Sequence, residues 1–208
     1  MAIEAILFDL GRVLVDLDYP STVRAFTASC SMSSAEFERV VGDANLACRY
    51  ESGEITTQQF YDHLSQAGAL NLPYSEFLAA WGAMLVPGLM ISGNLLRSLK
   101  SRYPLILLSN TNEAHIQHLS ATTKILDYFD YKVLSYEVGA MKPDRRIYER
   151  AIEVSGKRAD QLFFTDDREE NIQGARNLGI QAHRFISEQY LTSALRDAGI
   201  EVDVESFS

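Results

Sequence analysis

Short apolar runs that end in polar residues recur along this chain, and they limit what it can fold into. Runs of this length suit strands that are buried on both faces of a sheet. They are Ala5–Phe8, Leu105–Leu108, Lys132–Ser135 and Leu162–Phe164, with Ala182–Ile186 as a fifth candidate. Between them lie segments with helical spacing, at Leu89–Lys100, Ile147–Val154 and Glu169–Leu178. This alternation predicts an α/β fold with a parallel sheet covered by helices on both faces.

One stretch, from about Asp16 to Val86, breaks the alternation because it contains no strand-like run. Ser33 with Glu36, and Thr56 with Gln59, match the capping box that begins a helix. Residues 51–54 predict the end of the first of these helices, so that one helix covers the segment between Ser33 and Glu51. Such helices could form a lid or simply pack on the edge of the sheet. We predict a Rossmann-like core formed by residues 1–15 and 87–208, with an inserted all-helical cap over residues 16–86.

Charge and composition exclude several classes of partner. The net charge is −9, from 28 acidic and 19 basic residues, and this disfavours binding to nucleic acid or to anionic membranes, which requires clustered cations. No apolar run approaches the ~18 residues of a membrane helix, and the N-terminal segment lacks the basic region of a secretory signal. The sequence therefore predicts a cytoplasmic protein, with no signal for an oligomeric state. Cys30 and Cys48 are expected to be buried as small hydrophobic residues.

Polar residues stand where the predicted strands end. In a parallel α/β sheet, ligands bind at the carboxyl ends of the strands. Four separate connections deliver three carboxylates, a hydroxyl, an amide and an ammonium group to this edge: Asp9, Ser109 and Asn110, Lys142, and Asp166 and Asp167. A further amide, that of Asn171, follows Asp167 by four residues.

The charges of this set indicate its chemistry. Three carboxylates beside one lysine would repel each other and any anion unless a hard divalent cation lay among them, and Mg²⁺ prefers such oxygen ligands. With the cation in place, Asp9 can serve as a nucleophile in aspartyl-phosphate chemistry. Ser109, Asn110 and Lys142 would then hold the phosphoryl oxygens, on which the transition-state charge develops. The sequence thus predicts phosphoryl transfer without a nucleotide-binding loop.

Four segments resemble, in order, the motifs of the haloacid dehalogenase (HAD) superfamily: residues 8–14, 107–112, 139–144 and 163–171. The resemblance covers essentially the whole chain, because the predicted insert is similar to the C1 cap of that family. The Asp-Leu-Gly, Leu-Ser-Asn-Thr-Asn and Lys-Pro-Asp segments are most similar to a bacterial sugar-phosphate phosphatase group that includes α-D-glucose-1-phosphate phosphatase.

The resemblance implies a role for each residue of the set. Asp9 would be the nucleophile and, with Asp167 and the Gly11 carbonyl, a ligand of Mg²⁺. The remaining roles implied are phosphate binding by Ser109 and Asn110, charge neutralisation by Lys142, and support by Asp166 and Asn171. The implied activity is a phosphomonoesterase acting on a small phosphorylated metabolite, with a sugar phosphate expected.

Gly11 departs from the pattern, because most phosphatases of this superfamily carry there a second Asp that protonates the leaving oxygen. Such a group contributes ~10²–10⁴ in rate, so we expect either slow turnover of poor leaving groups or a substrate such as an anomeric sugar phosphate, whose leaving group departs readily. Haloacid dehalogenases also lack this Asp. A metal-independent dehalogenase and a non-catalytic phosphate-binding module therefore remain alternatives, although adjacent Asp166 and Asp167 beside a third acid disfavour a metal-free site.

The histidines show no metal-ligand pattern, and His115 and His118 are predicted to lie on a solvent-facing helix surface. Weaker candidates for substrate contacts, if the cap closes, are Arg12, Arg49, Tyr50 and Asn112.

Overall fold

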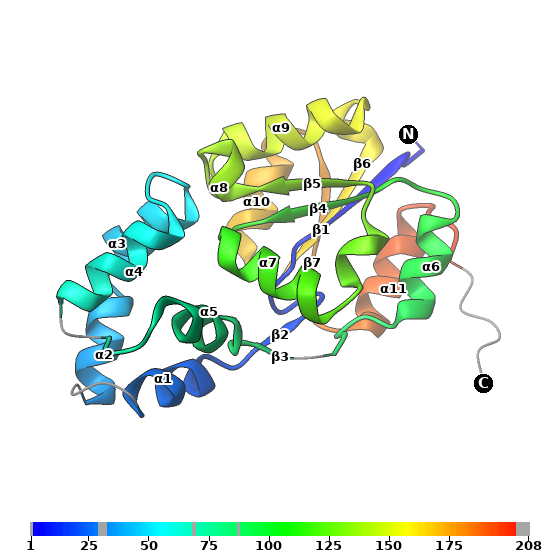
Figure 1. Cartoon of the computed structure of the whole chain (residues 1–208). Helices are drawn as coiled ribbons and strands as arrows, with labels where there is room; N and C mark the ends of the chain where they lie inside the picture. The colour runs from blue at the N-terminus through cyan, green and yellow to red at the C-terminus, as the bar shows by residue number, and fades with distance from the viewer. Residues whose placement is uncertain (1, 29–32, 68–69, 87, 203–208) are drawn as a thin grey trace.

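A computed structural model describes residues 2–28, 33–67, 70–86 and 88–202. At its centre lies a parallel sheet of five strands in the order β5-β4-β1-β6-β7 (Figure 1). The strands are β1 (Ala5–Phe8), β4 (Leu105–Ser109), β5 (Tyr131–Leu134), β6 (Leu162–Asp166) and β7 (Gln181–Arg184). The predicted parallel α/β core is confirmed, with each strand within two residues of its predicted bounds.

Helices cover both faces of the sheet because the central strands are apolar on both sides. Ile6 and Phe8 belong to one buried cluster, whereas Ala5 and Leu7 belong to another, as the alternation of side chains along a strand requires. The first cluster includes residues of α6 (Gly93–Lys100), α7 (Glu113–Thr122), the 3-10 helix η1 (Ile125–Tyr128) and α11 (Glu188–Asp197). The second includes residues of α9 (Arg145–Ser155) and α10 (Glu169–Arg176), with α8 (Ser135–Val138) and η2 (Ala159–Gln161) nearby.

In the described part of the chain, five helices follow one another between Asp18 and Ala83 (Figure 1). They pack around a separate hydrophobic cluster, to which Ala114 of α7 also contributes. They are α1 (Tyr19–Thr27), α2 (Ser34–Val41), α3 (Ala44–Glu51), α4 (Thr57–Gln66) and α5 (Tyr74–Gly82). Aromatic side chains fill the cluster, and the rings of Phe26 and Phe37 stack with centroids 4.9 Å apart. Both predicted capping boxes are present, at Ser33 and at Thr56. We refer to this helical segment below as the cap.

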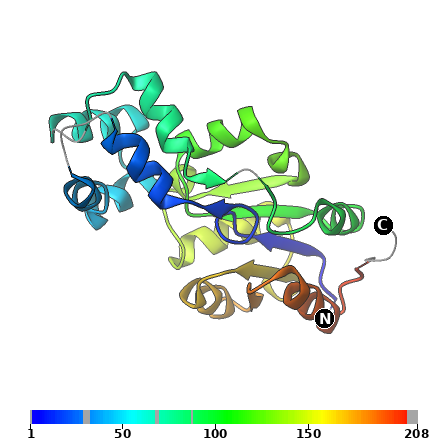
Figure 2. The same ribbon diagram turned by 90° about the horizontal axis from the view of Figure 1, so that it is seen from below.

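Two local predictions within the cap are wrong. Asp16–Leu17 (β2) and Leu85–Val86 (β3) form a two-stranded antiparallel sheet, visible in Figure 2 where the chain leaves the core and returns to it. Strands of two residues are too short to show a periodic pattern, and for this reason they were not predicted. The single helix expected between residues 33 and 51 is interrupted after Val41, because the Asp43 side chain accepts hydrogen bonds from Asn45 N and Leu46 N and so begins a new helix.

The expectation for Cys48 is also wrong, because its side chain is exposed. Leu46 and Tyr50, four residues apart on α3, face the cap interior, and Cys48 between them points away. Cys30 lies outside the described residues. In the part of the chain that the structure describes, every helix is too short or too polar to span a bilayer.

Candidate active site

The predicted polar residues meet at one edge of the sheet. Asp9 directly follows β1, Ser109 ends β4, and Asp166 ends β6. Lys142 lies in the loop between α8 and α9, and Asn171 lies on α10. Neighbouring parallel strands in register bring their carboxyl ends together, and Phe8 pairs with both Leu107 and Thr165. The sheet topology therefore assembles residues that are more than 150 positions apart in the sequence.

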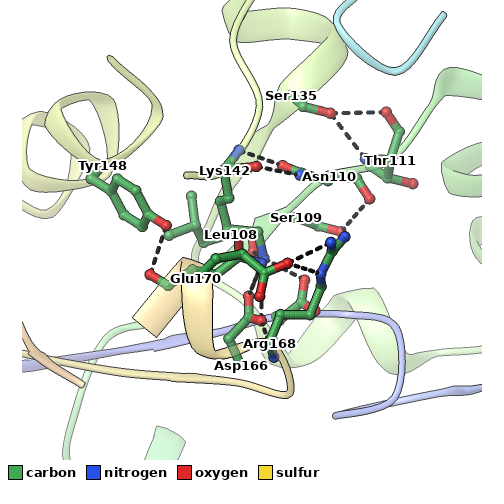
Figure 3. A network of polar contacts seen from close by, with 12 residues as sticks. Leu108, Ser109, Asn110, Thr111, Ser135, Lys142, Tyr148, Asp166, Arg168 and Glu170 are labelled. Carbon is green, nitrogen blue, oxygen red and sulfur yellow. Dashed lines mark hydrogen bonds and ion pairs between the residues drawn. The ribbon is translucent and has the colours of Figure 1, made fainter. Parts of the chain in front are cut away.

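Lys142 connects the residues at the end of β1 with those at the end of β6 (Figure 3). Its Nζ donates hydrogen bonds to Asp9 Oδ1 (2.6 Å), to Asp166 Oδ2 (2.6 Å) and to the carbonyl oxygen of Leu108 (2.9 Å). The residue is only 4% exposed. A buried ammonium group with two carboxylate partners keeps its charge, and both carboxylates raise the pKa of Lys142 against the opposing effect of its burial.

Asp166 forms hydrogen bonds with several residues of the cluster. It is fully buried, and its Oδ1 accepts from the backbone N–H of Arg168 (2.9 Å). The Asn171 side chain donates to both oxygens at 3.0 Å. With Lys142 on Oδ2 as well, Asp166 is saturated with protein hydrogen bonds, which suits a residue that orients its neighbours.

Asp9, Asp166 and Asp167 together can offer a metal ion one ligand atom each, and these atoms lie within 4.8 Å of one another. Because Asp166 is occupied by protein donors, Asp9 and Asp167 are the carboxylates best suited to bind the ion. A set of hard oxygen donors with room for water and phosphate oxygens is typical of Mg²⁺ rather than Zn²⁺. The residues present therefore fit magnesium.

Electrostatics also favour a cation here. Burial raises the pKa of Asp9 from 3.8 to about 6, and the charge of Lys142 offsets only part of this effect. Burial is likewise the largest cause that raises the pKa of Asp167, followed by the charge of Asp166. A divalent cation between the two acids would stabilise their charged forms.

The Asn110 side chain, which is predicted to bind phosphate, bonds to the backbone of Lys142 in this structure. Its Oδ1 accepts from Lys142 N (2.7 Å), and its Nδ2 donates to Lys142 O (2.9 Å), as Figure 3 shows. This pair of hydrogen bonds holds the Lys142 loop against the end of β4, so the side-chain amide serves to position Lys142. A second clamp lies beside it, where Ser135 Oγ bonds both the N–H and the carbonyl of Thr111. Ser109 is buried, with its hydroxyl next to Asn110 O (3.4 Å).

Gly11 and Arg12 lie in the turn that follows Asp9. The backbone φ of Gly11 is one that any residue can adopt, and a Cβ there would approach the Leu17 side chain to 3.0 Å. The next residue, Arg12, adopts the left-handed conformation instead, with a φ of 57°. The chain therefore has room for a side chain at position 11 if Leu17 moves slightly.

Two adjoining cavities lie between the cap and the core. One, of about 430 Å³, is lined by the polar cluster, including Asp9, Gly11, Lys142, Asp167 and Asn171. The other, of about 350 Å³, is mostly apolar and is lined by Tyr50, Phe60, Trp81 and Ser109 among others. Gly11, Leu17, Glu51 and Asn110 border both. A substrate could thus place its phosphate in the first cavity and the remainder in the second.

A larger apolar cavity of about 560 Å³, between α5, α7 and η1, contains none of the polar cluster. Nothing in its lining matches the chemistry of the strand ends, so we place the site at the polar cluster.

His115 does not face solvent as predicted, because it is 8% exposed and stacks on Trp81 with ring centroids 5.5 Å apart. Asn112 Oδ1 accepts from His115 N and from Tyr50 Oη, so its Nδ2 donates to His115 Nδ1. Burial lowers the pKa of His115 to about 4, and the ring is therefore neutral at pH 7. The helical spacing alone did not show which face of α7 is buried.

Residues 3–179 match the haloacid dehalogenase-like hydrolase family. This match covers most of the chain, and together with the fold and the acid cluster it shows that the protein belongs to this family and is a hydrolase.

Relatives of this chain within the hydrolase family are phosphatases. The chain is 28% identical to the D-ribitol-5-phosphate phosphatase of Bacteroides thetaiotaomicron, over 86% of this chain and 90% of that protein. It is 30% identical to the pyrimidine 5'-nucleotidase YjjG of Escherichia coli, over 63% of this chain and 61% of that protein. A crystal structure of a HAD family enzyme from B. thetaiotaomicron, a magnesium complex, superposes with a TM-score of 0.80 at 28% identity and covers 94% of this chain and 100% of that one.

Proposed function

We propose that this protein is a Mg²⁺-dependent phosphomonoesterase that acts on a small phosphorylated metabolite of the sugar phosphate class through an aspartyl-phosphate intermediate. The observation that carries the proposal is the Lys142 ammonium group bonded to both Asp9 and Asp166, with Asp167 beside them. Anionic substrate oxygens would gather at this point of the cavity, where the chain supplies a fixed positive charge.

In this mechanism Asp9 attacks the phosphorus atom, and its carboxylate is held in one orientation by Lys142. Lys142 also faces the charge that develops on the phosphoryl oxygens in the transition state. Asp166 and Asn110 position Lys142, by its ammonium group and by its backbone respectively. When bound by Asp9, Asp167 and the Gly11 carbonyl, Mg²⁺ supplies further positive charge beside the transferred phosphoryl group.

Several observations support a small organic phosphate as the substrate. The cavity next to the polar cluster measures about 350 Å³, which is at the low end for small-molecule sites. One relative is named as a phosphatase of a sugar alcohol phosphate, and another as a nucleotidase.

Hydrolysis of p-nitrophenyl phosphate with Mg²⁺, and again with excess EDTA, tests the proposal. We expect activity that depends on Mg²⁺, followed by selective turnover within a panel of phosphorylated sugars, polyols and nucleotides. The same preparations are given 2-chloropropionate. Release of chloride in EDTA without phosphatase activity would instead support the dehalogenase alternative, and phosphate binding without turnover would support the non-catalytic one.

A further inference from the structure

The reaction proposed above needs a proton donor for the leaving oxygen, and Gly11 cannot provide one. In the part of the chain that the structure describes, the carboxyl groups lining the polar cavity are Asp9, Asp167 and Glu51. Asp9 and Asp167 already have roles as nucleophile and metal ligand. His115 borders the adjoining cavity, but its pKa of about 4 makes it a poor acid at neutral pH. Glu51 remains.

Glu51 lies at the junction of the two cavities, because it lines both of them. It is the last residue of cap helix α3, whereas Asp9 comes from the sheet. In an in-line displacement the leaving oxygen lies on the side of the phosphorus opposite the nucleophile. A carboxyl group brought by the cap, at the border between the phosphate cavity and the apolar cavity, meets this geometric requirement.

The structure fixes this end of α3 against the core on both sides of Glu51. Tyr50 Oη donates to Asn112 Oδ1 on the core side (3.2 Å). Gly53 has a φ of 74°, and a Cβ there would lie only 2.1 Å from the carbonyl oxygen of Tyr136 in α8. Only glycine allows this close approach without strain, and Figure 1 shows the turn after α3 lying beside α8. Glu51 is therefore held by its neighbours rather than by its own side chain.

The Glu51 carboxyl has no hydrogen bond or ion pair with any of the described residues, unlike Glu54 in the same turn, which pairs with Arg49 at 2.6 Å. The charged groups around it are Arg168 and Asp9, and Arg12, Lys142 and Asp167 line the same cavity. Burial raises the pKa of Glu51, the charge of Arg168 opposes this, and the charge of Asp9 adds to it. A partly buried acid without a partner is available to exchange a proton with a substrate.

We propose that Glu51 is the general acid and base of this phosphatase and takes the role that an aspartate at position 11 would have. The inference rests on the proposed function. As the bond from Asp9 to phosphorus forms and the ester P–O bond breaks, Glu51 donates its proton to the leaving oxygen and an alcohol departs. The Glu51 carboxylate then takes a proton from water while the water oxygen attacks phosphorus, which releases phosphate, frees Asp9 and returns Glu51 to its protonated form.

Glu51→Gln tests the assignment, with Glu54→Gln as the matched control, both assayed with Mg²⁺ on a series of phosphate esters. A general acid contributes ~10²–10⁴ in rate, and most for leaving groups that need a proton. We expect Glu51→Gln to lower kcat/KM by this amount on alkyl phosphates and by much less on p-nitrophenyl phosphate. Loss of the base should also make nitrophenolate appear in a burst followed by slow turnover. Glu54→Gln should match the wild type.

Two further measurements separate a catalytic role of Glu51 from a structural one. Beryllofluoride binding with Mg²⁺ should be equal in Glu51→Gln and wild type, and Glu51→Asp should recover part of the alkyl phosphate activity. Wild-type rates on alkyl phosphates in Glu51→Gln, or an equal loss on every ester without a burst, would overturn the role of Glu51. Absence of wild-type activity on all monoesters would instead overturn the proposed function itself.

Discussion

Replacing Asp9 with asparagine should stabilise the metal-free protein while abolishing its activity. The charged Asp9 carboxylate is buried beside Asp166, and its pKa rises from 3.8 to about 6. A folded pKa above the unfolded value means that folding stability is complete below pH ~3.8 and is lost as the pH rises through about 6. The loss amounts to about 3 kcal/mol at pH 8, since each pKa unit corresponds to about 1.4 kcal/mol.

Asparagine has nearly the same shape but no charge, and its carbonyl oxygen can still accept the Lys142 hydrogen bond. We therefore expect Asp9→Asn to raise the free energy of unfolding by up to about 3 kcal/mol at pH 8 and by about half of this at pH 5. The measurement is urea unfolding in EDTA across this pH range. Saturating Mg²⁺ should shrink the difference, because only the wild type offers the ion a carboxylate at position 9 in addition to Asp167.

An increase that is equal at pH 5 and pH 8 would refute this reasoning, as would a variant less stable than the wild type at pH 8. Phosphatase activity should fall below a tenth of the wild-type rate in any case, because an amide cannot act as the nucleophile. More activity than this would contradict an aspartyl-phosphate mechanism, whatever the stability.

Further predictions concern the charged groups around Asp9 and the turn that follows α3. Lys142→Met should lower kcat/KM at least ~10²-fold, because Asp9 and Asp166 lose their shared cation; an unchanged value in steady-state kinetics would exclude Lys142 from the mechanism. Asp167→Ala should sharply raise the Mg²⁺ concentration needed for half-maximal activity, whereas an unchanged Mg²⁺ titration would remove Asp167 from the ligand set. Gly53→Ala should lower the free energy of unfolding by about 1–3 kcal/mol and slow alkyl phosphate hydrolysis, because Tyr136 O leaves no room for a Cβ. Wild-type values in unfolding and kinetic measurements would show that the turn tolerates the side chain.

The core of this fold could be predicted because its signals are local. The run Ala5–Phe8 is a strand with the predicted bounds, since four apolar residues followed by Asp9 leave little choice in a buried parallel sheet. The positions of Asp9, Ser109 and Asp166 at the ends of strands then placed them at one edge. The close grouping of these side chains also depends on the strand order, which places β1 between β4 and β6.

The remainder depends on packing between distant segments. The sequence indicated that a helix ends near residues 51–54, and α3 does end at Glu51. It did not indicate that this end meets α8 through Gly53, because the close contact with Tyr136 exists only once cap and core are assembled. For the same reason the sequence did not indicate that the Asn110 side chain bonds to the backbone of Lys142, 32 residues away in the sequence.

The short pairing of β2 with β3 has a consequence for how such a chain could be altered. Asp16 lies directly opposite Val86, and paired antiparallel residues are only ~4.5–5.5 Å apart. All of the chain between them therefore departs from the sheet domain and rejoins it at one point, as a closed loop whose two ends nearly touch. A segment attached in this way can be exchanged for one of another length or architecture without changing the distance that the rest of the polypeptide must bridge. New substrate preferences could thus arise by replacing the whole loop, while the strands that carry Asp9 and Asp166 keep their register.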